Sequence, residues 1–125
     1  MNKQVLKVDD HKKSYSDAAY FGNIAFVSGQ MSLDENNQPV PGTIAEEAER
    51  ALTNLRDVVE KLGATMEDVL FTSVNLLSND DFPGFNETYV KFFPKNPPAR
   101  ITVVVKELYG GLKIEITAVV VLNKK

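Results

Sequence analysis

Apolar positions that alternate with polar ones predict β-strands along much of this chain. The run at residues 69–77 is apolar on much of both faces, which is typical of a central strand, and strict alternation would place Val69 and Phe71 on one face. The predicted strands are a weak one at residues 2–8, two short runs within 18–29 around the tight-turn pair Gly22-Asn23, residues 69–77, and a terminal hairpin of residues 101–106 and 112–122 around Tyr109-Gly110-Gly111.

Helical periodicity predicts a first helix between residues 43 and 63. Thr43 and Glu46 have the spacing of a capping box, and Gly63 stands where a helix terminates in a left-handed residue. The acidic pairs Glu46-Glu47 and Asp80-Asp81 are interpreted as favourable charge at helix N-termini. The apolar stripe of this helix is Ile44, Ala48, Ala51, Leu52, Leu55, Val58, Val59 and Leu62.

A second, shorter helix is expected after residue 80. Asp80 or Asp81 can cap it, Pro83 is tolerated in its first turn, and Pro94 terminates it. An aromatic stripe along this helix is interpreted as core rather than as a ligand site. Its members are Phe82, Phe85, Tyr89, Phe92 and Phe93.

This order of elements predicts an α+β fold in one domain, residues 1–125, with a mixed sheet and two helices on one of its faces. The other face has no helix to cover it, so Val103 and Val105, or their neighbours, would stay bare in a monomer. A bare apolar face of this size usually marks an interface. The sequence therefore predicts an oligomer.

Composition narrows the function classes. The 125 residues carry a net charge of −3, and no basic stripe offers an electrostatic footprint for nucleic acid or an anionic membrane. The chain contains no cysteine, which excludes a disulfide framework and a thiolate nucleophile. The polar start and the lack of a long apolar run predict a cytoplasmic protein.

Two charges stand out of place in the strands near the C-terminus. Arg100 follows the stiff Pro97-Pro98-Ala99 element, and a guanidinium binds a carboxylate through two parallel hydrogen bonds. Glu115 could accept a proton from an attacking water if it faces a cleft. Each also has an ordinary interpretation, a surface arginine and a solvated strand face, and the residues alone leave both open.

No metal site is expected. His11 is the only histidine and lies in a charged segment, and no cluster of histidine, cysteine and carboxylate has the spacing of metal ligands. Gly110-Gly111 is expected to form a turn rather than a phosphate-binding loop.

Three segments are distinctive: Val27 to Gln30 (VSGQ), Phe85 to Arg100 (FNETYVKFFPKNPPAR) and Leu112 to Val120 (LKIEITAVV). Together they resemble the RidA family, also called YjgF. The resemblance implies a chorismate-mutase-like fold and a homotrimer with a barrel-like core, whose active sites lie between subunits. It also implies hydrolysis of 2-imino acids, such as 2-aminoacrylate (2-iminopropanoate) and 2-iminobutanoate, to 2-oxo acids and ammonia without a cofactor.

The resemblance also implies roles for individual residues. Arg100 matches the arginine that holds the substrate carboxylate, and Glu115 matches the glutamate associated with the hydrolytic water. Tyr15, Ser28 and Asn86 match residues that line the pocket, and Thr102 stands where the family often has a cysteine.

One segment departs from the family pattern. The common Gly-Pro-Tyr-Ser-Gln-Ala motif is replaced here by KSYSDA at residues 13–18. This change favours the alternative of a non-catalytic module that binds a small carboxylate such as a 2-oxo acid. Nucleic-acid cleavage, a further activity associated with the family, disagrees with the acidic charge.

Overall fold

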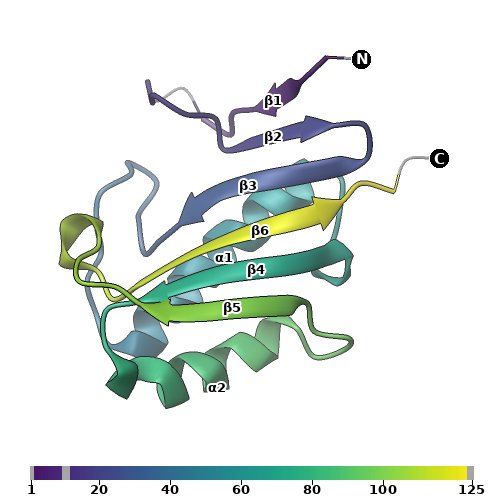
Figure 1. The fold of residues 1–125 in the computed structure, drawn as a ribbon. Coiled ribbons are helices and arrows are strands. Elements are labelled where there is room, and N and C mark those ends of the chain that lie inside the picture. The colour runs from purple at the N-terminus through teal and green to yellow at the C-terminus, as the bar shows by residue number, and fades with distance from the viewer. Residues whose placement is uncertain (1, 10–11, 124–125) are drawn as a thin grey trace.

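The computed structural model describes residues 2–9 and 12–123, so His11 lies outside the described residues. These described residues form two helices and six strands, which are labelled in Figure 1. In chain order they are β1 (Gln4–Leu6), β2 (Ala18–Phe21), β3 (Ile24–Gln30), α1 (Ile44–Lys61), β4 (Val69–Leu76), α2 (Phe82–Phe92), β5 (Ala99–Val104) and β6 (Ile114–Val121), with short 3-10 turns at Met66–Asp68, Asn79–Asp81 and Tyr109–Gly111.

The strands form one mixed sheet in the order β1-β2-β3-β6-β4-β5, in which only the β4–β5 pair is parallel. The predicted terminal hairpin is therefore wrong, because β4 lies between β5 and β6. The helix α2 forms the crossover that a parallel pair requires, and β5 becomes the edge strand. The central position predicted for residues 69–77 is confirmed.

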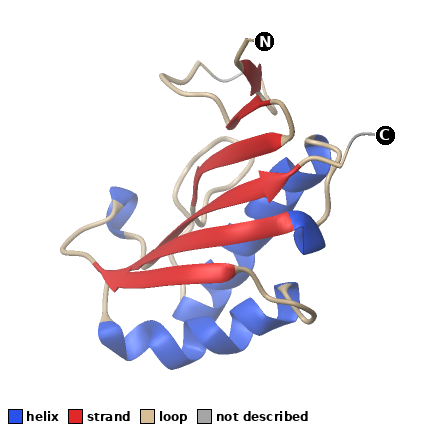
Figure 2. Ribbon diagram, turned by 45° about the vertical axis from the view of Figure 1, so that its right-hand side comes forward, coloured by secondary structure: helices blue, strands red, loops and turns tan. Residues whose placement is uncertain are grey.

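Both helices cover the same face of the sheet, as predicted and as Figures 1 and 2 show. The capping box at the start of α1 is present, with Thr43 N donating to Glu46 Oε1 at 2.9 Å, and Gly63 has φ of 85°. The cap predicted for α2 differs from the observed one. Asp81 occupies the N-cap position, but the side-chain cap forms earlier, where Ser78 Oγ accepts from Asp80 N.

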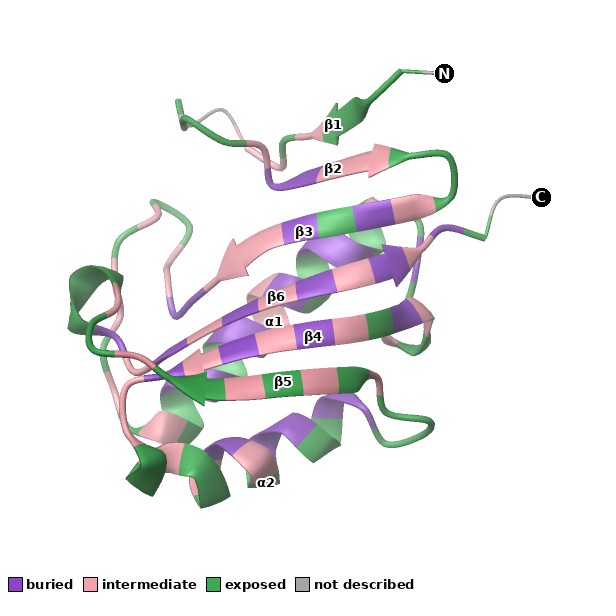
Figure 3. Cartoon of the chain, in the orientation of Figure 1, coloured by how far each residue is buried: buried purple, intermediate pink, exposed green. Residues whose placement is uncertain are grey.

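The core lies between this face and the helices. Alternate side chains of β6 enter it, so Figure 3 shows buried and half-buried residues alternating along that strand. The fully buried apolar side chains include Leu52, Leu55, Val74, Leu76, Phe85, Ile114 and Ile116.

The alternation predicted for residues 69–77 fails at the start of the strand. The register between β4 and β6 shifts between Val69 and Phe71, which is the mark of a β-bulge. As a result Val69 enters the core and Leu70 becomes 52% exposed. The predicted faces hold from Phe71 onward.

Glu47 fixes the N-terminus of α1 to the start of β6. Its carboxylate is fully buried and accepts hydrogen bonds from Lys113 N at 2.7 Å and from Gly42 N at 3.2 Å. The Lys113 ammonium lies 3.6 Å from the same carboxylate and donates to Gly42 O. The interpretation of Glu47 as a helix-end charge was incomplete, because this carboxylate also holds two elements together.

The opposite sheet face carries bare apolar side chains, as predicted for Val103, whereas Val105 follows β5 and is half-buried. Phe26, Ile101 and Val103 are 60%, 52% and 44% exposed. Among the described residues, no helix has both the length and the apolar character needed to cross a bilayer.

Candidate functional site

Arg100 lies on the helix-covered side of the edge strand. Its Cα partner on β4 is Thr72, which is fully buried beneath α2. The guanidinium carbon lies 4.7 Å from the ring centroid of Tyr89 and 5.1 Å from that of Phe85, and Nη1 donates to Asn86 Oδ1 at 2.9 Å. In the sheet of the described residues β5 is the edge strand, and Arg100 is half-buried there.

The prediction that the aromatic stripe of α2 is core is confirmed for four of its members and wrong for Phe82, and part of the stripe also contacts this arginine. Phe85, Tyr89, Phe92 and Phe93 are buried, whereas Phe82 is at the surface with its ring centroid 5.6 Å from the Arg100 guanidinium. The contact between these rings and Arg100 could not be predicted from the sequence, because it depends on which face of the sheet the Arg100 side chain lies on.

Tyr89 links this arginine to the core. Its hydroxyl makes a 2.7 Å hydrogen bond with Thr72 Oγ1. Burial raises the pKa of Tyr89 above its ordinary value, although the bond to Thr72 and the charge of Arg100 oppose this rise.

An open pocket of about 400 Å³ adjoins Arg100 and is lined by Pro97, Pro98 and Tyr89 among others. Thr102 follows on the same side of β5, since its Cα partner is the buried Val74, and it is half-buried. Arg100, Asn86 and Thr102 therefore form one group at the edge of the sheet.

Glu115 lies on the other face. Its neighbours Ile114 and Ile116 point into the core, so Glu115 points to the open side, where Asn75 Nδ2 donates to its carboxylate at 3.3 Å. Here an open pocket of about 740 Å³ is lined by Tyr15, Ser28, Gly29, Tyr109 and Glu115 among others.

Gly29 leaves the space that the Glu115 side chain occupies. A Cβ at residue 29 would overlap the nearer carboxylate oxygen and lie 2.9 Å from Cδ. The register between β3 and β6 also shifts between Val27 and Gln30. Sequence reasoning singled out Ser28 in this element, but the glycine beside it shapes the pocket. Tyr109 was likewise missed as a lining residue, since it was interpreted only as part of a turn.

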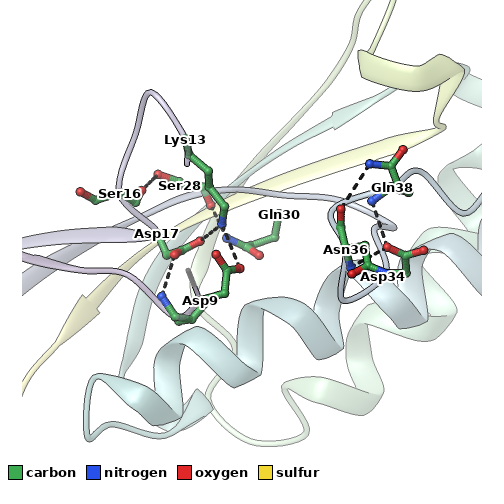
Figure 4. Close-up of polar contacts among 10 residues, drawn as sticks. Asp9, Lys13, Ser16, Asp17, Ser28, Gln30, Asp34, Asn36 and Gln38 are labelled. Carbon is green, nitrogen blue, oxygen red and sulfur yellow. Dashed lines mark hydrogen bonds and ion pairs between the residues drawn. The ribbon is translucent and has the colours of Figure 1, made fainter. Parts of the chain in front are cut away.

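Tyr15 is half-exposed at the rim of this pocket on the segment that precedes β2. The segment is joined to β3 where Ser28 Oγ donates to Ser16 O at 2.6 Å and Ser28 N donates to Asp17 O (Figure 4). Lys13 Nζ donates to Asp17 Oδ1 at 2.9 Å and lies 3.4 Å from an Asp9 oxygen.

The charge of Lys13 is stabilised in this place. Burial lowers its pKa, but the hydrogen bond to Asp17 and the charges of Asp17 and Asp9 outweigh burial and raise the pKa above its ordinary value. Lys13 is therefore a cation throughout the physiological range of pH.

The six candidate residues thus fall into two groups on opposite faces of one chain's sheet. Arg100, Asn86 and Thr102 lie at the β5 edge, whereas Tyr15, Ser28 and Glu115 lie at the larger pocket. A site that contains both groups needs residues from two chains. Within residues 2–9 and 12–123, no group of three histidine, cysteine or acidic residues could hold a metal ion.

Comparisons with known proteins identify the family. Residues 9–122 match the family model described as endoribonuclease L-PSP. The 2-iminobutanoate/2-iminopropanoate deaminase of Dermatophagoides farinae is 39% identical over 87% of this chain and 86% of its own. A RutC family protein of Saccharolobus solfataricus is 40% identical over 84% of each chain.

A solved structure supports the same family relationship. The crystal structure of RidA from an Antarctic Psychrobacter species superposes with a TM-score of 0.84 at 30% identity, covering 95% of this chain and 97% of that one. The chain is therefore a member of the endoribonuclease L-PSP family, the RidA (YjgF) family that its motifs resemble.

Proposed function

We propose that the protein is a cofactor-independent deaminase that hydrolyses reactive 2-imino acids and their enamine forms to 2-oxo acids and ammonia. Its substrates would include 2-iminobutanoate and 2-iminopropanoate, the imine form of 2-aminoacrylate. The deaminase name of a relative that is 39% identical supports this activity. The observation that carries it is that the chain has two open pockets on opposite faces of its sheet, one with a guanidinium and one with a carboxylate. In an assembly that joins them, they would supply an anion clamp and a proton acceptor.

The proposal includes a homotrimer in which each site lies between two chains. The side chains of Phe26, Ile101 and Val103 are exposed on the open sheet face. Burial of this apolar surface against another chain would favour association. In such an assembly the β5 edge of one chain would meet the larger pocket of the next. This arrangement would bring Arg100 of one chain near Glu115 of another.

The proposed reaction needs one water and no redox step. Arg100 holds the substrate carboxylate through two hydrogen bonds, while Asn86 fixes one end of the guanidinium. Glu115 accepts a proton from water as the oxygen bonds to the imine carbon. The electron pair of the C=N π bond moves to the substrate nitrogen, which takes up this proton to give a carbinolamine. Glu115 then moves the hydroxyl proton of the carbinolamine to the nitrogen, the C–N bond breaks as the C=O bond forms, and ammonia and the 2-oxo acid leave. Tyr15, Ser28 and Thr102 would bind the substrate around these groups.

The direct test generates 2-aminoacrylate with a serine dehydratase and follows pyruvate release with and without the protein. We expect acceleration by the wild type and its loss in Arg100→Ala and Glu115→Gln. Arg56→Ala is the matched control, because Arg56 also stacks on an aromatic ring of α2, Phe92 at 5.1 Å, but lies outside both pockets. Equal acceleration by Arg100→Ala would contradict the proposal.

Subunit mixing tests the shared site. Arg100→Ala and Glu115→Gln chains, each inactive alone, are refolded or expressed together. If each site draws on two chains, random mixing restores about a quarter of the wild-type sites. No recovery in mixed assemblies that contain both chains would refute a site between subunits.

The alternative of a carboxylate-binding module has its own signature. In that case the wild type would bind 2-oxobutanoate in calorimetry, dependent on Arg100, without accelerating pyruvate release. RNA cleavage that accompanies the preparation and survives Arg100→Ala would indicate a contaminant.

A further inference from the structure

The segment that carries Tyr15 is closed by charged side chains where the related motif has an uncharged Gly-Pro entry and a glutamine. Lys13 and Asp17 stand four residues apart with Tyr15 between them, and their side chains meet at 2.9 Å. Figure 4 shows Lys13 reaching from one end of the segment to Asp17 at the other. The ion pair therefore closes a loop of five residues around the tyrosine.

Asp17 is bonded through every polar group it has. Its second carboxylate oxygen accepts from Val8 N at 2.9 Å, its own N donates to Leu6 O, and its carbonyl accepts from Ser28 N. These bonds reach both sides of the segment, toward β1 and toward β3. A group held to Asp17 is thus held to the sheet itself.

Lys13 links Asp17 to Tyr15, because its ammonium contacts both side chains. The Lys13 side chain is only 12% exposed and that of Asp17 8%, so the pair is largely removed from water. The Lys13 ammonium also lies 5.6 Å from the Tyr15 ring centroid, within the range of a cation–π contact. Exposed ion pairs contribute little, but breaking a desolvated pair leaves a charge without its partner.

We propose that Lys13 and Asp17 form an ionic clasp that positions Tyr15 at the rim of the larger pocket. Lys13 is thereby a positioning residue for substrate binding, an inference that rests on the proposed function of this pocket. Asp9, with a carboxylate oxygen 3.4 Å from the Lys13 ammonium, strengthens the clasp.

Kinetics distinguish positioning from a general structural role. Lys13→Met should raise KM about tenfold, because Tyr15 contributes to substrate binding. The value of kcat should be nearly unchanged, because Glu115 still accepts the proton from the attacking water. Lys13→Arg should restore KM, since it keeps the cation. Lys7→Met is the matched control, a loss of the same charge from an exposed lysine on the preceding segment. An unchanged KM in Lys13→Met would overturn the inference.

A double-variant cycle tests whether the effect passes through Tyr15. Lys13→Met combined with Tyr15→Ala should raise KM no further than Tyr15→Ala alone. If the changes in KM of the two single variants were fully additive in the double variant, the inference that the clasp positions Tyr15 would be refuted. Lys13→Gln, which keeps a donor for Asp17 without the charge, serves as a second variant if Lys13→Met folds poorly.

Fluorine NMR makes the test independent of catalysis. The chain has four tyrosines, so 3-fluorotyrosine labelling gives few signals, and Tyr15→Phe assigns the relevant one. Lys13→Met should move the Tyr15 signal toward the free value while Lys7→Met leaves it in place. If the wild type hydrolyses no imine but this shift occurs, the proposed function fails and the clasp stands. If hydrolysis is observed and neither the shift nor KM changes, the clasp fails alone.

Discussion

Gly29→Ala should slow the reaction by displacing Glu115. A Cβ at residue 29 would overlap the nearer carboxylate oxygen and lie 2.9 Å from Cδ, so Cδ must retreat by about 0.5 Å to reach the 3.4 Å of ordinary contact. The nearer oxygen must move further. Residue 29 is not among the glycines with positive φ, so its backbone tolerates alanine and the effect falls on the carboxylate.

The size of the effect follows from the proposed role of Glu115. A misplacement of about 1 Å in a catalytic group costs up to about 100-fold in rate, which is about 2.7 kcal/mol of activation free energy. We therefore expect kcat to fall by about 10- to 100-fold. KM should change little, because in the proposed assembly Arg100 of the other chain holds the carboxylate.

Steady-state pyruvate release measures kcat and KM, and urea unfolding checks that the variant is folded. The free energy of unfolding should change by less than about 1 kcal/mol, since a flexible side chain can yield to the new methyl group. A Gly29→Ala enzyme with wild-type kcat would refute the role assigned to the Glu115 position.

Three predictions concern stability and are measured by urea unfolding. Glu47→Ala should reduce the free energy of unfolding by about 2 kcal/mol, because the backbone N–H of Lys113 loses its buried acceptor, and an unchanged midpoint would contradict this. Tyr89→Phe should cost about 1–2 kcal/mol by leaving the buried Thr72 hydroxyl unpaired. Lys13 and Tyr89 have pKa values raised from 10.5 and 10.0, so their contribution is intact below about pH 10 and lost as pH rises through the folded values. Unfolding at pH 8 and pH 11 checks this sign, and Tyr89→Phe should weaken the alkaline loss.

Local signals allowed the first helix and the hairpin of β2 and β3 to be predicted from the sequence. The capping box of Thr43 and Glu46 and the left-handed Gly63 lie within a few residues of the ends that they define. The turn at Gly22-Asn23 is equally local, and Gly22 has φ of 62°. Elements of this kind need no information about their partners.

Pairing between distant segments was beyond the sequence. Residues 105–113 are short enough to suggest a hairpin between the last two strands, yet β5 pairs with β4 across a helical crossover. The alternation of residues along the strand placed Glu115 on a polar face. No local signal, however, shows whether Arg100 on the other strand points to the same face of the sheet or to the opposite one. The buried site of Glu47 was hidden for the same reason, because its main donor, Lys113 N, is 66 residues away.

The position of β6 determines when the sheet can form during synthesis. It is the last strand in sequence order and yet lies between β3 and β4. Until the ribosome has released it, β3 and β4 lack the strand that pairs with both of them, so their edges stay unpaired and can associate wrongly. The native sheet, and any assembly that uses its open face, must therefore form after translation of β6 rather than during it.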